Sequence, residues 1–229
     1  MAARNYGQYC GVTTALELVG ERWALLIVRD LLVGPRRYTD LKAGLPRIPT
    51  NILSTRLKEL QDAQVVRRLP MAHGLGYELT DYGRRLEDVV LALGRWGFEA
   101  MGDPAEGDVV TSDSLTMALR TAFQADAAAA LPATAYEVRL GEIALGVRTA
   151  ADGLVIAPLP GSSGVPAPAE VDPLADGVDL AFETGPGIRS LIAGRQTAAE
   201  AIEGGAVRVL TGDPALLERF AESFRIVSP

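Results

Sequence analysis

The stretch 50–80 constrains the fold most, because a helical pattern is followed directly by two short β-type runs. Leu53, Leu57 and Leu60 recur at helical spacing within a helix predicted over 50–62, and they predict one apolar face. The runs VVRRLPM and GYELT then flank the segment AHGL and predict a β-hairpin. A helix with a single leucine face has to pack on other elements, so we expect a small helical domain that carries the hairpin.

The face of this helix opposite the leucines carries short polar groups and a lysine. On a helical wheel, Asn51, Ser54, Thr55 and Lys58 fall together, and Thr50 lies at the N-terminal end of the same helix. Amide, hydroxyl and ammonium groups can hydrogen-bond base edges or phosphates when such a helix enters the major groove of DNA. The alternative interpretation is an ordinary solvent-exposed face.

Two pairs of adjacent arginines add to this pattern. Arg67 and Arg68 lie in the first strand of the hairpin, where strand alternation points them in opposite directions, so we expect one of them to contact DNA. Arg36 and Arg37 precede a short helix predicted over 38–45 and are candidates for contacts to the DNA backbone, with solubility as the alternative. The order of three helices, a polar-faced helix and a hairpin is that of a winged helix-turn-helix.

The charge of the chain is distributed unevenly. The formal net charge is −7, but residues 1–102 carry 14 basic and 11 acidic side chains, whereas residues 103–229 carry 8 and 18. Within 36–68 there are 8 basic and 3 acidic residues. An acidic protein can bind a polyanion through such a basic island, and the acidic half should then face away from it.

The remaining N-terminal segments are also helical. Residues 13–33 form two helical pieces with a break at Gly20, and Gly34-Pro35 ends the second piece. A long helix is predicted over 81–102, with Thr80 or Asp81 as its cap. Its apolar stripe consists of Leu86, Val89, Val90, Leu93, Trp96 and Ala100.

A change of pattern after this helix predicts two domains, 1–102 and 112–229. The segment 102–112 contains glycine, proline and acids without periodicity, as linkers do. The second half alternates between β-type runs, such as AYEVRLG, EIALGVRTA, GLVIAP and VDLAFET, and short helical runs. The predicted fold class is a mainly α winged helix-turn-helix domain followed by an α+β domain with an antiparallel sheet.

Several function classes are disfavoured by residue content. The sequence shows no His/Cys/carboxylate cluster for a metal, no phosphate-binding glycine-lysine motif and no triad, so we expect neither an enzyme nor a cofactor. It shows no signal peptide and no transmembrane segment, and its single cysteine, Cys10, excludes an internal disulfide. We therefore expect a cytoplasmic protein that does not bind membranes.

Residues 10–98 resemble the HxlR family of bacterial transcriptional regulators, which is close to the MarR-type winged helices. The segments GERWALLIVRDLLVGPRRYTDL, LSTRLKEL and YELTDYGRRL, together with the preceding cysteine, have the order and spacing of the family. The resemblance implies double-stranded DNA as partner. The family commonly has a serine before the recognition helix, whereas this chain has Pro49, which leaves Thr50 as the nearest cap.

The same resemblance implies a homodimer formed by N-terminal segments and the long helix after the hairpin. We expect the interface to include Leu86, Val89, Val90, Leu93 and Trp96. Some relatives use the cysteine as a redox or electrophile sensor, so Cys10 is a candidate redox sensor. The alternative is a half-buried small residue without a chemical role.

The segment GPGIRSLIAGRQTAAEAIEGGAVRVLTGDPALLERFAESF resembles the C-terminal part of sterol-carrier-protein-like domains. Such domains are α+β and hold an apolar ligand between sheet and helices, which implies a ligand-sensing or accessory module. Two hypotheses follow. The chain is a homodimeric DNA-binding regulator on an inverted-repeat operator, with an apolar small molecule as a candidate effector, or it is an apolar small-molecule or lipid carrier with a vestigial DNA-binding domain.

Overall fold

The computed structural model describes residues 5–72, 74–162 and 172–226. The chain divides into two compact units, an N-terminal unit (Met1–Val90) and a C-terminal unit (Leu91–Pro229). This division falls ahead of the linker expected at 102–112, inside the helix α6 (Glu87–Ala100). The second half of that helix is therefore part of the C-terminal unit.

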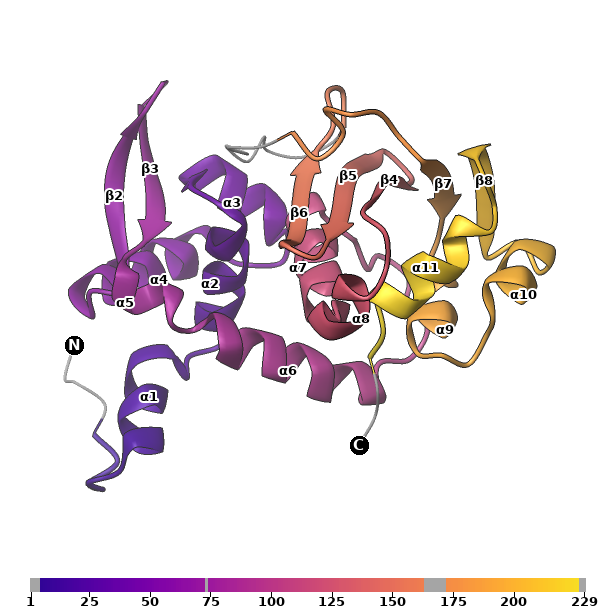
Figure 1. The fold of residues 1–229 in the computed structure, drawn as a ribbon. Coiled ribbons are helices and arrows are strands. Elements are labelled where there is room, and N and C mark those ends of the chain that lie inside the picture. Colours follow the sequence, from indigo (N-terminus) through magenta and orange to yellow (C-terminus); the bar gives the residue numbers. More distant parts are fainter. Residues whose placement is uncertain (1–4, 73, 163–171, 227–229) are drawn as a thin grey trace. The chain divides into compact units, whose positions relative to one another are not determined.

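The described part of the N-terminal unit contains short helices and a three-stranded antiparallel sheet. Figure 1 shows the hairpin that β2 and β3 form in this sheet. Its helices are α1 (Gly11–Val19), α2 (Ala24–Val33), α3 (Tyr38–Gly44), α4 (Thr50–Asp62), α5 (Asp81–Arg84) and the first turn of α6. Its strands are β1 (Arg36–Arg37), β2 (Val66–Met71) and β3 (Gly74–Leu79), in the order β1-β3-β2. The two helical pieces within 13–33, the break at Gly20 and the hairpin are confirmed.

Helix α4 has the bounds that the sequence predicts, from Thr50 to Asp62. Leu53, Leu57 and Leu60 are each at most 1% exposed, so the predicted leucine face is buried in the N-terminal unit. Each such side chain contributes roughly 1.5–3 kcal/mol of burial free energy, which ties the helix to its domain. The helix begins without a side-chain cap, because Pro49 occupies the N-cap position and Thr50 is the first helical residue.

The prediction of a single long helix over 81–102 is wrong in one respect, because the chain forms two helices, α5 and α6, with a turn between them. Thr80 caps α5 as predicted, since its hydroxyl accepts a hydrogen bond from the backbone N–H of Gly83. A Cβ at Gly83 would lie 2.1 Å from the carbonyl oxygen of Val65. Only glycine allows α5 to approach the start of β2 so closely.

The C-terminal unit combines short helices with one five-stranded sheet. Its helices are the second half of α6, α7 (Ser112–Ala122), α8 (Ala125–Ala129), α9 (Ile188–Ile192), α10 (Ala198–Glu203) and α11 (Leu216–Ser223). Its strands are β4 (Thr134–Leu140), β5 (Ile143–Ala150), β6 (Gly153–Pro158), β7 (Leu180–Thr184) and β8 (Val207–Gly212). The α+β prediction is confirmed for this unit.

The prediction of a purely antiparallel sheet is wrong, because the strand order is β6-β5-β4-β7-β8 and β4 pairs with β7 in parallel. Strands β4, β5 and β6 form an antiparallel meander. The chain then passes from the β6 edge to the other side of β4, where β7 runs in the direction of β4. Strand β8 pairs antiparallel with β7. A crossover of this kind produces a parallel pair within an otherwise antiparallel sheet.

Aromatic side chains fill the core between this sheet and its helices. The ring of Phe220 from α11 lies 5.3 Å from that of Tyr136 and 5.1 Å from that of Phe182, both in edge-to-face geometry. Phe224 packs on Phe220 at 4.5 Å between ring centroids. All four side chains belong to the hydrophobic core of the C-terminal unit. Within the described part of the chain, no helix has the length and apolarity needed to cross a membrane.

Candidate nucleic-acid interface

The polar face of α4 is open to solvent. Thr50, Asn51, Ser54 and Lys58 are exposed and Thr55 is half-buried, on the side of the helix away from the leucines. The hydroxyl of Ser54 donates to the carbonyl oxygen of Thr50 at 3.1 Å, and that of Thr55 donates to the carbonyl oxygen of Asn51 at 2.9 Å. Both hydroxyl oxygens keep acceptor capacity, and the Asn51 amide offers two donors and an acceptor. This face can therefore hydrogen-bond base edges.

Lys58 is held only by an exposed ion pair. Its ammonium lies 2.7 Å from the carboxylate of Asp62, and the two side chains are 74% and 65% exposed. Such pairs stabilise proteins by less than about 1 kcal/mol. A phosphate can therefore replace Asp62 as the partner of this lysine at little cost.

The first turn of α4 is also held by a residue that the sequence did not single out. The hydroxyl of Tyr38, at the start of α3, donates to the carbonyl oxygen of Thr50 at 2.8 Å and lies 3.3 Å from the hydroxyl of Ser54. The contact joins two helices across a turn, so no local pattern could indicate it. Tyr38 thereby fixes the end of α4 that would enter a groove first.

The hairpin presents its two arginines on different faces, as the alternation predicts. Arg67 pairs with Glu78 in the β2–β3 register, and its guanidinium Nε donates to the Glu78 carboxylate at 2.8 Å. Arg68 pairs with Tyr77, and its guanidinium lies 5.7 Å from the ring centroid of that residue. Both arginine side chains are exposed. Arg68 can reach a polyanion without breaking an ion pair that the structure shows, whereas Arg67 would leave the largely buried carboxylate of Glu78.

The structure corrects the prediction for Arg36. We expected this residue to contact the DNA backbone, but its side chain is fully buried, and its guanidinium donates to the carbonyl oxygen of Pro35 at 2.9 Å. The reason is that β1 adds to the hairpin sheet, with Arg36 opposite Tyr77. Arg37 is half-buried, and its backbone N–H donates to the carboxylate of Asp40 at the start of α3. Arg37 alone of this pair stays available at the surface.

Cys10 lies at the N-cap of α1 and is exposed, so it is not the half-buried residue of the alternative interpretation. The backbone N–H of Thr13, then that of Val12 and the Thr13 hydroxyl, hold the pKa of the thiol below its ordinary value. Exposed apolar side chains lie close in sequence, including Tyr9, Val12 and Leu16. The hydrogen bonds thus stabilise the thiolate relative to that of an ordinary thiol, at an accessible position.

Helix α6 has two different faces. Val89, Leu93 and Trp96 form an exposed apolar stripe, and Trp96 is 75% exposed. Leu86 and Val90, also predicted for the interface, are half-buried. Contiguous exposed apolar surface of this kind marks interaction sites in soluble proteins.

The opposite face of α6 is built into the C-terminal unit. A Cβ at Gly94 would lie 2.9 Å from the hydroxyl oxygen of Thr121 in α7, so the two helices are in close contact there. One turn further on, the guanidinium of Arg189 lies 5.9 Å from the ring centroid of Phe98. Arg189 also donates to the carbonyl oxygen of Gly102. No local pattern of residues indicates these contacts.

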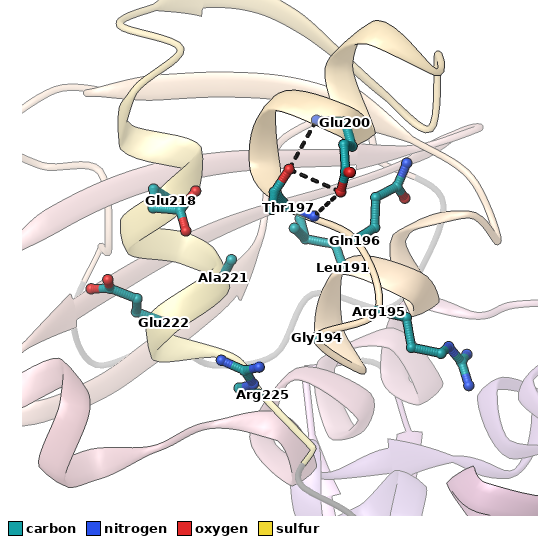
Figure 2. A pocket seen from close by; sticks show the side chains of 10 residues that line it. All are labelled: Leu191, Gly194, Arg195, Gln196, Thr197, Glu200, Glu218, Ala221, Glu222 and Arg225. Atoms are coloured by element: carbon teal, nitrogen blue, oxygen red, sulfur yellow. Dashed lines mark hydrogen bonds between the residues drawn. The ribbon is translucent and has the colours of Figure 1, made fainter.

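The C-terminal unit has an open pocket of about 190 Å³ between α11 and the segment that joins α9 to α10 (Figure 2). Glu218, Glu222 and Arg225 line one side, and Thr197 and Glu200 hydrogen-bond to each other on the other side. Its polar, charged lining differs from the apolar site that the sterol-carrier resemblance implies. Its volume is below the roughly 300–1,000 Å³ of typical small-molecule sites.

Among the residues that the structure describes, no group of three or more His, Cys, Asp or Glu side chains is placed to hold a metal ion.

Comparison with known proteins places these features in a family. Residues 18–104 match the model of the HxlR-like helix-turn-helix family. An uncharacterized HTH-type transcriptional regulator of Mycobacterium tuberculosis is 41% identical over 96 residues, which are 41% of this chain and 60% of the relative. The uncharacterized HTH-type transcriptional regulator YvaP of Bacillus subtilis is 35% identical over 88 residues, which are 37% of this chain and 82% of that relative.

A crystal structure of the HTH-type transcriptional regulator YtcD of Bacillus subtilis is 32% identical and matches 40% of this chain and 96% of its own, with a TM-score of 0.38. This chain spans 60% of the length of the M. tuberculosis relative. The match to residues 18–104 and the coverage of YvaP show that the chain belongs to the HxlR-like helix-turn-helix family.

Proposed function

We propose that this chain is a DNA-binding transcriptional regulator that acts as a homodimer on an inverted-repeat operator. One observation carries the proposal, namely that Asn51, Ser54 and Lys58 are exposed on α4 while its leucine face is buried. Such a helix can enter the major groove while its anchor stays in the protein. Membership of the HxlR-like helix-turn-helix family supports the same function.

Two groups of residues in the proposed interface have different roles toward DNA. Asn51, Ser54 and Thr55 hydrogen-bond base edges and supply sequence selectivity. Lys58 and one of the two hairpin arginines, Arg67 or Arg68, contact phosphates, which fix the position of the protein but carry no sequence information. The local excess of basic residues in 36–68 favours association with the polyanion despite the net charge of −7.

The exposed stripe of α6 supports a homodimer. Val89, Leu93 and Trp96 are apolar, exposed and spaced to lie on one helical face, and a two-fold dimer would cover this face on both protomers. The dimer then presents two copies of α4 to successive turns of one duplex face. Half-sites separated by about 34–36 Å follow from that geometry.

The C-terminal unit is proposed to modulate operator affinity through α6. The packing of Gly94 on Thr121 and of Phe98 under Arg189 supports this role, because the unit includes the same half-helix that carries Leu93 and Trp96. An apolar small molecule remains the effector class that the sterol-carrier resemblance suggests. An effector that shifts α7 or α9 would then alter the dimer and its DNA affinity.

Selection of bound sequences from a random duplex pool tests the proposed function. The full-length protein should enrich an inverted repeat, because two symmetry-related α4 helices read it. The Asn51→Ala variant should lose preference at the base pair that this amide contacts, at a cost of about 1–3 kcal/mol per half-site. Wild-type protein that enriches no sequence would refute the function, and an unchanged motif in the variant would refute the role of Asn51.

A further inference from the structure

One charged residue of α4 points into the domain instead of toward solvent. The side chain of Arg56 is only 11% exposed, and its guanidinium Nη2 lies 2.9 Å from the carboxylate of Glu21. Its Nη1 also pairs with the carboxylate of Glu59, one turn later in the same helix. The Glu21 contact therefore joins α4 to the segment between α1 and α2, whereas the Glu59 contact stays within α4.

The leucine face alone does not fully determine the rotation of α4 about its own axis. Hydrophobic burial is non-directional, so it holds the helix in place without strongly specifying its rotation about its own axis. Charge-assisted hydrogen bonds have defined distances and directions. The Arg56–Glu21 pair and the bond from the Tyr38 hydroxyl to the Thr50 carbonyl fix α4 at two points, more than one turn apart.

The segment that carries Glu21 is itself held in an unusual backbone conformation. Trp23 has φ of 86°, which is rare for a bulky side chain and costs of order 1–3 kcal/mol. The guanidinium of Arg22 lies 5.2 Å from the Trp23 ring centroid, and the N–H of Ala24 donates to the carbonyl oxygen of Glu21 at 2.9 Å. Such a conformation persists only where surrounding contacts determine it, so Glu21 offers a defined anchor.

We propose that Arg56 is a positioning residue for DNA recognition. Through Glu21 it sets the rotation of α4, so that Asn51 and Ser54 face the bases, and it makes no contact with DNA. This inference rests on the proposed function, because it assigns a role within the same interface.

The test compares two carboxylates that bind the same arginine. Glu21→Gln removes the charge from the contact that orients α4 against the domain and so weakens it, whereas Glu59→Gln weakens only the contact within the helix. For the full-length protein on its selected operator, Glu21→Gln should lower affinity by at least about fivefold per half-site, the loss of one base contact. Glu59→Gln should leave affinity and base preference unchanged. Thermal unfolding of both variants controls for loss of the fold.

Arg56→Met and Arg56→Lys separate positioning from direct contact. Arg56→Met should lower operator affinity and relax base preference while the slope of log affinity against log salt stays that of the wild type. An arginine that bound a phosphate would instead reduce the slope by about 1 per subunit. Arg56→Lys keeps the charge and should restore part of the base preference.

Three results would overturn the inference while the proposed function stands. They are equal loss of affinity in Glu21→Gln and Glu59→Gln, a reduced salt slope in Arg56→Met, and unchanged operator binding in Glu21→Gln. Wild-type protein without sequence-selective binding would refute the proposed function itself, and the inference with it. If Arg56 variants do not fold, the comparison of the two glutamate variants decides.

Discussion

Two glycines of α6 offer a direct test of how this helix is joined to the C-terminal unit. A Cβ at Gly94 would lie 2.9 Å from the hydroxyl oxygen and 3.0 Å from Cγ2 of Thr121, whereas a Cβ at Gly97 would meet nothing within 4 Å. The Thr121 side chain cannot turn away freely, because it is buried and its hydroxyl donates to the carbonyl oxygen of Met117 at 2.7 Å. The same substitution should therefore have opposite effects at the two positions.

The magnitudes follow from helix propensity and packing. Replacing glycine by alanine within a helix stabilises it by about 0.8–1.0 kcal/mol, and Gly97→Ala should show that gain. At Gly94 the added methyl group is forced against Thr121, and overpacking costs about 1–3 kcal/mol. Gly94→Ala should thus be neutral or destabilising, with a difference of about 2 kcal/mol between the variants. Thr121→Ala removes both contacting atoms and should cancel most of the effect of Gly94→Ala.

Equilibrium urea unfolding followed by circular dichroism measures these free energies. It should be repeated at two protein concentrations, because dimerisation makes the midpoint depend on concentration. A changed dependence then reports a change in dimer affinity, whereas an equal shift at both concentrations reports a change in fold stability. Equal stabilisation by Gly94→Ala and Gly97→Ala would refute the close packing of α6 on α7. It would also remove the main support for coupling through this helix.

Three further predictions concern the dimer face, the thiol and a buried phenol. Trp96→Ser should convert the dimer to monomers in sedimentation analysis without unfolding the chain, and an unchanged dimer would place the interface elsewhere. Because hydrogen bonds at the start of α1 lower the pKa of Cys10, its alkylation rate should reach half of its plateau at a lower pH than that of a free cysteine in the same assay, and a midpoint at or above that of the free cysteine would contradict the effect. Burial is the largest cause that raises the pKa of Tyr136 to about 12, so folding favours the protonated phenol. The free energy of unfolding should therefore fall as pH rises from about 10 toward 12. Tyr136→Phe should flatten that fall in unfolding measurements, and an equally steep fall in the variant would assign it to other groups.

Local patterns predicted helix α4 well, because its determinants lie within it. The leucines at 53, 57 and 60 define the buried face, and Pro49 sets where the helix begins. A helical wheel also places Arg56 away from the polar face of Asn51, Ser54, Thr55 and Lys58. It does not indicate the partner Glu21, because the two residues are far apart in the sequence.

The errors all involve contacts between distant segments. The burial of Arg36 depends on its strand pairing with Tyr77, and the parallel pairing of β4 with β7 depends on a chain crossover. The division of the expected long helix has a partial local signal in Gly83, but the reason for that glycine is its approach to Val65. Strand partners and close approaches of this type carry almost no signature in a single sequence.

The salt dependence of operator affinity tests the account most directly. With about 4 phosphate contacts per subunit, log affinity against log salt should have a slope of about −7 for the dimer, because each contact releases counterions. Lys58→Ala should reduce the magnitude of that slope by about 2 per dimer, since one phosphate contact is lost on each subunit. An affinity that does not change with salt, or a Lys58→Ala slope equal to that of the wild type, would contradict the proposal that the exposed face of α4 meets the duplex.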